Sequence, residues 1–425
     1  MSEKWAKGTI CIQGGYEPEA GETRVLPIYQ SATYKYDDPD QLEDLFSLKA
    51  NGHLYSRISN PTVQSLEEKF TKLEGGVGAV ATASGQSAIL LAILNLCKTG
   101  DHLISVSTLY GGTVNLFNVH LKRLGIDVTF VDPEATTDEV LAVAKDNTKL
   151  IYGETIGNPG LNVLDFEKFA NISKALRVPF IVDNTVGTPY LCNPFKYGAN
   201  VVIHSTTKYS DGHAQTIGGI IVDGGNFDWN NEKFPDFINS DAAYHGLRYA
   251  KDLGESAYIF KLRVTLLRDF GPCMSPFNAY LTNLGLETLH LRMERHSENA
   301  LALAKYLQNH SKVSWVNYPY LEGSNGYEKA KKYLNGGGSG ILTFGIKGGI
   351  EEGKAFCRAL KLVALAVTLG DVRSCILHPA TTSHSQLNEK DLLASGVTKD
   401  LLRVSVGIEA IDDIIEDFEN ALKEI

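Results

Sequence analysis

Short apolar segments alternate with helical patterns between residues 78 and 223, and this alternation constrains the fold more than any other feature. The segments have strand length, and there are seven of them: 78–83, 102–106, 128–131, 150–153, 180–183, 201–204 and 219–222. Several are continuously apolar, which is typical of strands covered by helices on both faces. Strands that alternate with helices form mostly parallel sheets, so the sequence predicts a large α/β domain around a mostly parallel seven-stranded sheet.

The rest of the chain predicts an arm before this domain and a smaller domain after it. Residues 1–60 show little periodicity, and Asn60-Pro61 then predicts a helix start, because a capping residue precedes proline at the first helical position. We therefore predict an N-terminal arm (1–60), a large domain (61–262) and a smaller C-terminal α+β domain (263–425). The elements expected in that last part are helices at 255–269, 285–307 and 411–423 and strands at 341–345, 362–369 and 401–406.

Charge and cysteine usage limit the partners and the compartment. The formal net charge of the 425-residue chain is −10, which argues against nucleic acid or an anionic membrane as a partner. The start of the chain lacks the apolar core of a signal peptide, and the longest apolar run, at 88–97, is too short to span a bilayer. The six cysteines are scattered without a C-x-x-C pair, so we expect reduced thiols and a cytoplasmic location.

Polar residues that follow two of the predicted strands predict a site for pyridoxal 5′-phosphate (PLP). Asp183 ends the segment 180–183, and Lys208 follows the segment 201–204, with Ser205 and Thr207 between. Because ligands in parallel sheets bind beyond the carboxyl ends of the strands, these residues should meet. PLP needs an amine for a Schiff base, an acid to pair with its pyridinium nitrogen and donors for its phosphate. Taken singly, Lys208 is more typical of a surface lysine, and Asp183 is typical of a turn after a strand.

The charge of Asp183 would serve the chemistry of such a cofactor. A carboxylate about 4 Å from a pyridinium gains about 4 kcal/mol at an effective dielectric of about 20. That gain would raise the pKa of the pyridine by about three units at most. A protonated ring withdraws electrons and stabilises a carbanion at the substrate Cα. A partly desolvated lysine beside such a cation has a lowered pKa, so it can serve as the Schiff-base amine and then as a general base.

The turn Ser84-Gly85-Gln86 is a candidate phosphate cradle. It stands at a predicted strand end and opens a helical pattern at 87–97. A helix amino terminus presents free N–H groups and a partial positive charge to an anion, and glycine lets the backbone approach closely. The alternative for this turn alone is an ordinary helix cap.

Eight motifs, in order along the chain, carry a resemblance to a known family. They lie at 55–62, 84–86, 110–113, 154–159, 183–185, 205–208, 378–380 and 402–407. On these motifs the chain resembles the Cys/Met-metabolism group of fold-type I PLP enzymes over nearly its whole length. The resemblance implies a PLP transferase with a large domain built on a mostly parallel sheet and a smaller C-terminal domain.

The resemblance also implies roles around the cofactor. Lys208 would bind PLP and then shuttle protons, and Asp183 would pair with the pyridinium. Tyr110 would stack on the cofactor ring and handle the proton at the leaving group. The rest of the cofactor would be held by neighbouring backbone and hydroxyl groups, those of Gly85, Gln86, Thr185, Ser205 and Thr207.

Further roles concern the substrate and a second subunit. Arg403 and Asn158 would bind the substrate carboxylate, with help from the backbone or hydroxyl of Thr368. Tyr55 and Arg57 would reach the phosphate of a neighbouring subunit, which implies a homo-oligomer, with a homotetramer of active-site-sharing dimers expected and a dimer as the alternative. From the residues alone, Arg403 is also typical of a surface strand, Tyr110 of a core and Arg57 of a solvated arm.

Residues within and between the motifs favour one branch of the family, the sulfhydrylases. Gly112 stands where methionine γ-lyases usually carry cysteine, and Gln86 where several γ-lyases and γ-synthases carry methionine. The segments 223–246, 266–279 and 286–296 are also similar to sulfhydrylases, whereas 368–373 is closer to the γ-lyase pattern. We therefore predict γ-replacement on O-acetyl-L-homoserine with sulfide or methanethiol, giving homocysteine or methionine and acetate. A PLP-dependent γ-lyase or γ-synthase is the alternative.

Other functional classes lack their motifs in this sequence. A nicotinamide-binding oxidoreductase would carry G-x-G-x-x-G after its first strand, and the sequence has none there. His378 and His384 are six residues apart without H-E-x-x-H or a cysteine pair, so we expect no metal and interpret them as structural loop residues. A non-catalytic binding protein is the remaining alternative, and it would purify without colour.

Overall fold

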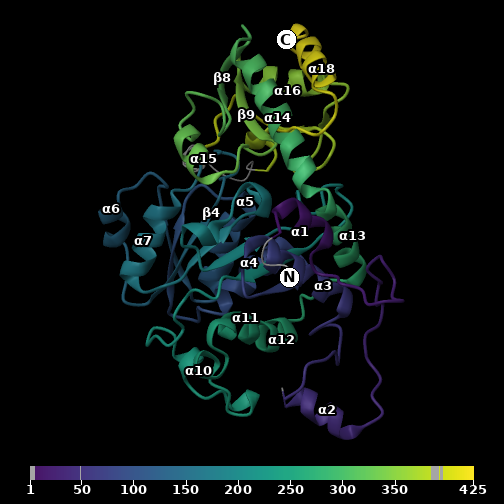
Figure 1. The fold of residues 1–425 in the computed structure, drawn as a ribbon. Coiled ribbons are helices and arrows are strands. Elements are labelled where there is room, and N and C mark those ends of the chain that lie inside the picture. The colour runs from purple at the N-terminus through teal and green to yellow at the C-terminus, as the bar shows by residue number, and fades with distance from the viewer. Residues whose placement is uncertain (1–4, 48, 384–391, 393–395) are drawn as a thin grey trace.

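The computed structural model describes residues 5–47, 49–383, 392 and 396–425. Figure 1 shows a large body around a seven-stranded sheet and a smaller body, drawn above it, around a five-stranded sheet. The predicted α/β class, with a smaller C-terminal domain, is therefore confirmed.

All seven strands predicted between residues 78 and 223 are present in the large sheet, in the order β1-β7-β6-β5-β4-β2-β3. Only β7 runs against its neighbours β1 and β6, and the other pairs are parallel. The central strands are buried along most of their length, as their apolar sequences predict. The strands are β1 (Gly78–Thr82), β2 (His102–Val106), β3 (Asp127–Val131), β4 (Thr148–Glu154), β5 (Phe180–Asp183), β6 (Val201–His204) and β7 (Gly219–Asp223).

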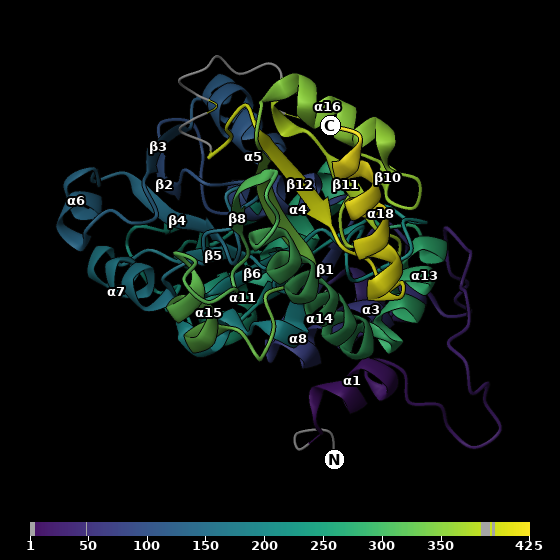
Figure 2. The same ribbon diagram turned by 90° about the horizontal axis from the view of Figure 1, so that it is seen from above.

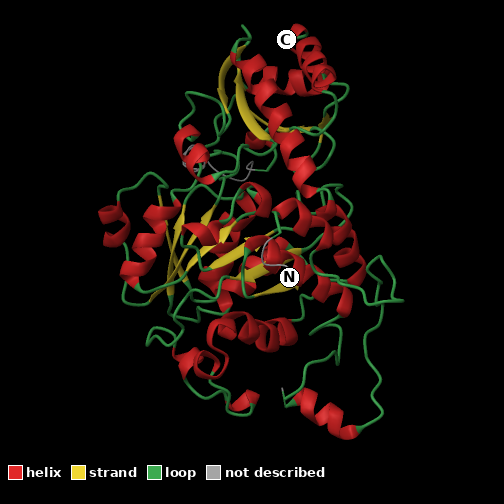
Figure 3. Ribbon diagram, in the orientation of Figure 1, coloured by secondary structure: helices red, strands yellow, loops and turns green. Residues whose placement is uncertain are grey.

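Helices lie on both sides of this sheet, as Figure 3 shows in red and yellow. The first of them, α3 (Pro61–Glu74), begins where the sequence predicts, because the Asn60 side chain accepts bonds from the N–H groups of Thr62 and Val63. It ends at Gly75, which adopts the left-handed conformation with φ 79°. The other helices of the sheet region are α4 (Gly85–Leu94), α5 (Gly111–Asn115), α6 (Thr137–Ala142), α7 (Phe166–Leu176) and α8 (Thr188–Leu191).

Two further groups of helices flank the large body. The expected arm contains α1 (Lys7–Gln13), which packs against α3, and α2 (Pro39–Phe46), which Figure 1 shows far from the sheet. The predicted helix 255–269 is confirmed as a nearly continuous helical segment, α11 (Ala257–Leu262), a π-helical turn and α12 (Arg268–Phe270). Two short helices, α9 (Pro235–Ile238) and α10 (Tyr249–Leu253), precede it.

The helix predicted at 285–307 is two helices, α13 (Pro276–Glu287) and α14 (Leu289–Gln308). The chain leaves the helical conformation at Thr288, where φ is −107° and ψ is 7°. Leu286 and Leu289 are nevertheless both fully buried, so the apolar pattern continues across the break and conceals it in the sequence. Helix α14 then runs from the large body to the small one, where it contacts β8, β9 and α18.

The small sheet has the order β10-β11-β12-β9-β8, and all its pairs except β10–β11 are antiparallel. The strand predicted at 362–369 was too long, because only Ala364–Leu365 pair, at the exposed sheet edge. Two strands were not predicted, β8 (Val313–Asn317) and β11 (Cys375–Leu377). The remaining elements are β9 (Ile341–Ile346), β10 (Ala364–Leu365), β12 (Leu401–Ser405), α15 (Tyr327–Tyr333), α16 (Ile350–Ala359) and α18 (Ile411–Lys423).

The apolar core is divided between the two bodies. One cluster fills the large body, and a second joins α14, the small sheet, α16 and α18. Met293 of α14 lies in the first cluster and Leu303 in the second, so this one helix is anchored in both. The predicted domain boundaries after residues 60 and 262 stay predictions. Among the described residues, no helix is both long and apolar enough to cross a membrane.

A buried carboxylate on α18 tests how the small body is held together. Asp417 accepts hydrogen bonds from the N–H groups of Lys361, Leu362 and Val363 at 2.8, 3.0 and 3.0 Å. Asp417→Ala leaves these donors without their acceptor, which should cost about 3 kcal/mol. We expect the melting temperature, followed by circular dichroism, to fall by roughly 5 °C. The exposed neighbour Glu416 is the control, and equal melting temperatures for Asp417→Ala and Glu416→Ala would contradict this prediction.

Candidate active site

A pocket of about 520 Å³ lies between the two bodies, beyond the carboxyl ends of β4, β5 and β6. Its volume is in the range of small-molecule sites. Eleven of the thirteen residues predicted for the site line it, and they come from both bodies: Gly85, Gln86, Tyr110, Asn158, Asp183, Thr185, Ser205, Thr207, Lys208, Thr368 and Arg403. The other two, Tyr55 and Arg57, do not.

Lys208 is the amine of this pocket. It lies in the turn after β6 and is only partly exposed. Burial, and then the positive charge of Arg403, lower the pKa of the Lys208 amine below its ordinary value. A lower pKa increases the fraction of unprotonated amine, which is the form that attacks a carbonyl carbon.

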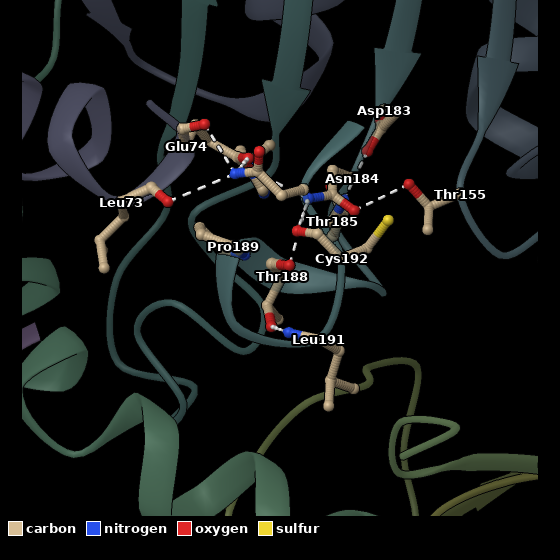
Figure 4. A network of polar contacts seen from close by, with 12 residues as sticks. Leu73, Glu74, Thr155, Asp183, Asn184, Thr185, Thr188, Pro189, Leu191 and Cys192 are labelled. Atoms are coloured by element: carbon tan, nitrogen blue, oxygen red, sulfur yellow. Dashed lines mark hydrogen bonds and ion pairs between the residues drawn. The ribbon is translucent and has the colours of Figure 1, made fainter. Parts of the chain in front are cut away.

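Asp183 supplies a partly buried carboxylate at the end of β5, on the pocket wall. Its Oδ1 accepts the N–H of Thr185 at 2.9 Å, and the Thr185 hydroxyl accepts the N–H of Ser205 at 2.8 Å, so these two bonds join the ends of β5 and β6. Figure 4 shows Asp183 and Thr185 from close by. Burial raises the pKa of Asp183, against the bonds from Thr185, which lower it. A cation placed opposite would favour the ionised form.

The amino terminus of α4 and the turn after β6 form a cradle for an anion. Ser84 caps α4, and the next two residues begin the helix, where N–H groups lack partners within the helix. A Cβ on Gly85 would lie 2.6 Å from the Cβ of Ser205, so only glycine allows the helix start to approach that turn. Thr207 is held there through its hydroxyl, which accepts the N–H of Gly218 at 3.1 Å.

Gly112 makes room for two of the predicted site residues. A Cβ at this position would lie 2.5 Å from the Tyr110 ring and 2.7 Å from the Gln86 amide nitrogen. The Tyr110 ring is half-exposed at the pocket, and its N–H donates to Glu154 Oε1 at 2.8 Å. The arrangement of Tyr110 and Gln86 therefore depends on the absence of a side chain at residue 112.

Arg403 brings a buried guanidinium from β12 of the small body. Its Nη1 donates to Asn158 Oδ1 at 3.2 Å, and its Nη2 donates to the carbonyl oxygen of Thr368 at 2.8 Å. Its Nε has no partner among the described residues, although it is buried. A guanidinium with an unused donor in a pocket is suited to bind a carboxylate.

Glu154 is a pocket residue to which the sequence analysis assigned no role. It ends β4 beside Asp183 of β5, and it is buried. Burial, together with the charge of Asp183, raises the pKa of Glu154 well above its ordinary value. The sequence contains a signal for this residue. Glu154 directly follows the apolar segment 150–153, much as Asp183 ends the apolar segment 180–183.

Tyr55 and Arg57 lie on the exposed arm. The Arg57 guanidinium stacks on the Tyr55 ring at 5.1 Å from its centroid, and both side chains are exposed. Their roles therefore stay predictions.

His378 lies in the loop after β11, where its ring bonds to the Thr381 hydroxyl and the Lys399 carbonyl. His384 lies outside the described residues.

The pocket fits PLP by the chemistry of its donors. It combines an amine, a partly buried carboxylate, a glycine-lined helix start with hydroxyl groups, and a separate guanidinium. These are the groups that a PLP enzyme uses for the aldehyde, the pyridine nitrogen, the phosphate and the substrate carboxylate. Lys208, Asp183 and the cradle of Gly85, Gln86, Ser205 and Thr207 would hold the cofactor.

Comparison with known proteins agrees with this chemistry. Residues 8–423 match the family model described as Cys/Met metabolism PLP-dependent enzyme. An O-acetyl-L-homoserine sulfhydrylase of Leptospira meyeri is 46% identical, over 100% of this chain and 98% of that protein. A homocysteine synthase of Schizosaccharomyces pombe is 47% identical, over 98% and 97% of the two chains.

A solved structure extends the comparison to three dimensions. A Campylobacter jejuni protein, provisionally assigned as an O-acetylhomoserine (thiol)-lyase and containing a pyridoxyl-lysine phosphate, superimposes with a TM-score of 0.95. It is 37% identical and covers 99% of this chain and 100% of its own. From the chemistry of its pocket and these similarities, the 425-residue chain is a PLP-dependent enzyme. It belongs to the Cys/Met metabolism family.

The lowered pKa of Lys208 predicts how the apoprotein captures its cofactor. The rate at which the visible absorbance of bound PLP appears should rise with pH and level off below pH 10.5, the ordinary pKa of a lysine. Arg403→Gln removes a positive charge that lowers this pKa, so its profile should shift to higher pH. Arg358→Gln, on the exposed face of α16, is the control and should leave the profile unchanged. Identical profiles for both variants would contradict an influence of Arg403 on Lys208.

Proposed function

We propose that this enzyme catalyses γ-replacement on O-acetyl-L-homoserine, with sulfide or methanethiol as the nucleophile. The bond between Cγ and the ester oxygen breaks, acetate leaves with the electron pair, and a bond between Cγ and sulfur forms. The products are homocysteine or methionine and acetate. The observation that carries the proposal is one pocket with Lys208 and Asp183 on its large-body side and Arg403 on the other, in a chain close to relatives of that activity.

Bound PLP supplies the electron sink that makes protons on the substrate Cα and Cβ acidic. Arg403, oriented by Asn158 and by the Thr368 carbonyl, would bind the substrate carboxylate through its remaining donors. Lys208 Nζ would take the Cα proton, because it is the amine of the pocket and its pKa is lowered. Asp183 would keep a negative charge beside the pyridine nitrogen.

Tyr110 would act at the leaving group. Its ring lies at the pocket, where the bond from its own N–H to Glu154 fixes the backbone and Gly112 leaves space for the ring. The hydroxyl would hold a proton near the ester oxygen of the substrate and then near the sulfur of the product. The two apolar residues beside Thr368, Val367 and Leu369, would cover the substrate chain.

We also propose a homo-oligomer, with a tetramer built from active-site-sharing dimers. Tyr55 and Arg57 are exposed on the arm and do not line the pocket of their own chain, which supports a function in a second subunit. A cytoplasmic location is proposed on the grounds that all six cysteines are free thiols.

Product analysis tests the reaction. With O-acetyl-L-homoserine and sulfide, the enzyme should form homocysteine and acetate, and Lys208→Ala should lower the rate by at least about a thousandfold. O-Succinylhomoserine, methionine and cystathionine, each with and without sulfide, are the comparison substrates. Faster release of 2-oxobutyrate from methionine or cystathionine would instead indicate a γ-lyase. Turnover retained in Lys208→Ala would overturn the assignment of Lys208.

Mixing two inactive variants tests the shared site. Arg57→Ala and Lys208→Ala should each be inactive alone, whereas co-expressed subunits form hybrids in which one site combines an intact Lys208 with an intact Arg57. Random pairing should restore about a quarter of the wild-type activity. The absence of restored activity in verified hybrids, or high activity of Arg57→Ala alone, would contradict the shared site.

A further inference from the structure

A buried carboxylate behind the pocket contacts residues adjacent to the predicted site. Glu74, the last residue of α3, is 1% exposed and lines no pocket wall. Its Oε1 accepts hydrogen bonds from His204 Nε2 at 2.7 Å and from Asn184 Nδ2 at 2.9 Å, and its Oε2 accepts one from Asn193 Nδ2 at 3.2 Å. The function proposed above does not use this group.

Two of the three partners of Glu74, Asn184 and His204, are chain neighbours of pocket residues. Successive residues of an extended chain point to opposite faces. Asn184 follows Asp183, and His204 precedes Ser205, so each of these two partners is next to a pocket residue. Each also lies on the opposite side of the strand end and is buried.

A third strand end joins the same network. The hydroxyl of Thr155 donates to Asn184 Oδ1 at 2.7 Å, and Thr155 follows Glu154, the pocket residue of β4. Figure 4 shows Asn184 with Thr155 on one side and Glu74 on the other. One carboxylate of α3 thus contacts the end of β6 directly, the end of β5 directly and the end of β4 through Asn184.

Displacing Asn184 or His204 from this network costs hydrogen bonds to Glu74 that are buried. A buried carboxylate without hydrogen-bond donors is unstable, and donors that lose a buried acceptor are unstable as well. The His204 ring also packs on Phe70 of α3, with ring centroids 5.2 Å apart. His204 can therefore move neither toward the pocket nor away from it without loss of a contact to α3.

We propose that Glu74 is a positioning residue for the PLP site, acting through Asn184 and His204 to hold Asp183 and Ser205 at the separation that the cofactor requires. In this position Asp183 would pair with the ring nitrogen of the cofactor and Ser205 would bind its phosphate. The proposal rests on the function proposed above only insofar as both require bound PLP.

The test is PLP binding to the apoprotein, followed by the visible absorbance of the bound cofactor. Glu74→Ala should weaken PLP binding by about tenfold or more, because it frees two strand ends at once. It should also shift the absorbance maximum, since the distance between Asp183 and the cofactor ring changes. Glu74→Gln has the same shape and keeps an acceptor for His204 and Asn184, so it should recover most of the affinity and the wild-type band.

A control separates positioning from stability. Asp417→Ala also removes a buried carboxylate with three N–H donors, but in the small body, away from the pocket. It should lower the melting temperature and leave the affinity for PLP and the absorbance maximum unchanged. Thr155→Val removes only the hydroxyl that donates to Asn184. It should weaken PLP binding by about two- to fivefold and shift the absorbance maximum in the same direction as Glu74→Ala.

The outcomes distinguish this proposal from the proposed function. Wild-type affinity and band position in Glu74→Ala, despite a lower melting temperature, would show a purely structural role and overturn the proposal. If Glu74→Ala fails to fold, unchanged binding by Thr155→Val overturns it as well. If the wild-type protein forms no homocysteine but binds PLP, the proposed function fails while the positioning of PLP by Glu74 is still tested.

Discussion

The site depends on one geometric constraint, the alternation of side chains at the ends of three adjacent parallel strands. β4, β5 and β6 end at the same edge of the sheet, so the residues there are brought together although they are far apart in sequence. At each strand end one residue faces the pocket and its neighbour faces the helices. Asp183 and Asn184 are such a pair, and a slip of one residue in the register would exchange their positions. The chemistry of the pocket is therefore inseparable from the packing behind it.

The same constraint explains which parts of the fold can be predicted from the sequence. Strands buried on both faces are continuous apolar runs, and all seven runs of the large sheet were identified. In the small body β8 contains Ser314 and Trp315 in a half-exposed pattern, and β11 has only three residues. Such strands carry no clear periodicity, because pairing with neighbours rather than burial defines them. The break at Thr288 was missed for the opposite reason, since the apolar pattern continues through it.

The structure brings predicted site residues together in one pocket where a polar residue ends an apolar strand or begins a helix. Lys208, Asp183 and Gly85 carry that signal, and the pocket contains all three. Glu154 carries it as well, although the role that the family resemblance implies within its motif falls on Asn158. Glu74 carries no such signal, since it ends a helix and its partners are defined only by the folded sheet. Contacts of this kind are tertiary and have no trace in a single sequence.

The spacing between the two halves of the pocket is set by Tyr209, the residue after Lys208. Its hydroxyl accepts the N–H of Gly340 at 3.0 Å, and its carbonyl accepts Arg292 Nη1 of α14 at 2.7 Å. Arg292 is itself buried, and with no acid bonded to it among the described residues it depends on such carbonyl partners. The segment that carries Lys208 is thus bonded on both sides to elements of the C-terminal part of the chain. Because Arg403 lies on a strand of that same part, these bonds constrain the distance from the Lys208 amine to the guanidinium. The substrate must then place its carboxylate at Arg403 and its Cα at Lys208. Its acyl group would extend toward the more exposed side of the pocket, which is lined by Tyr110 and Val367.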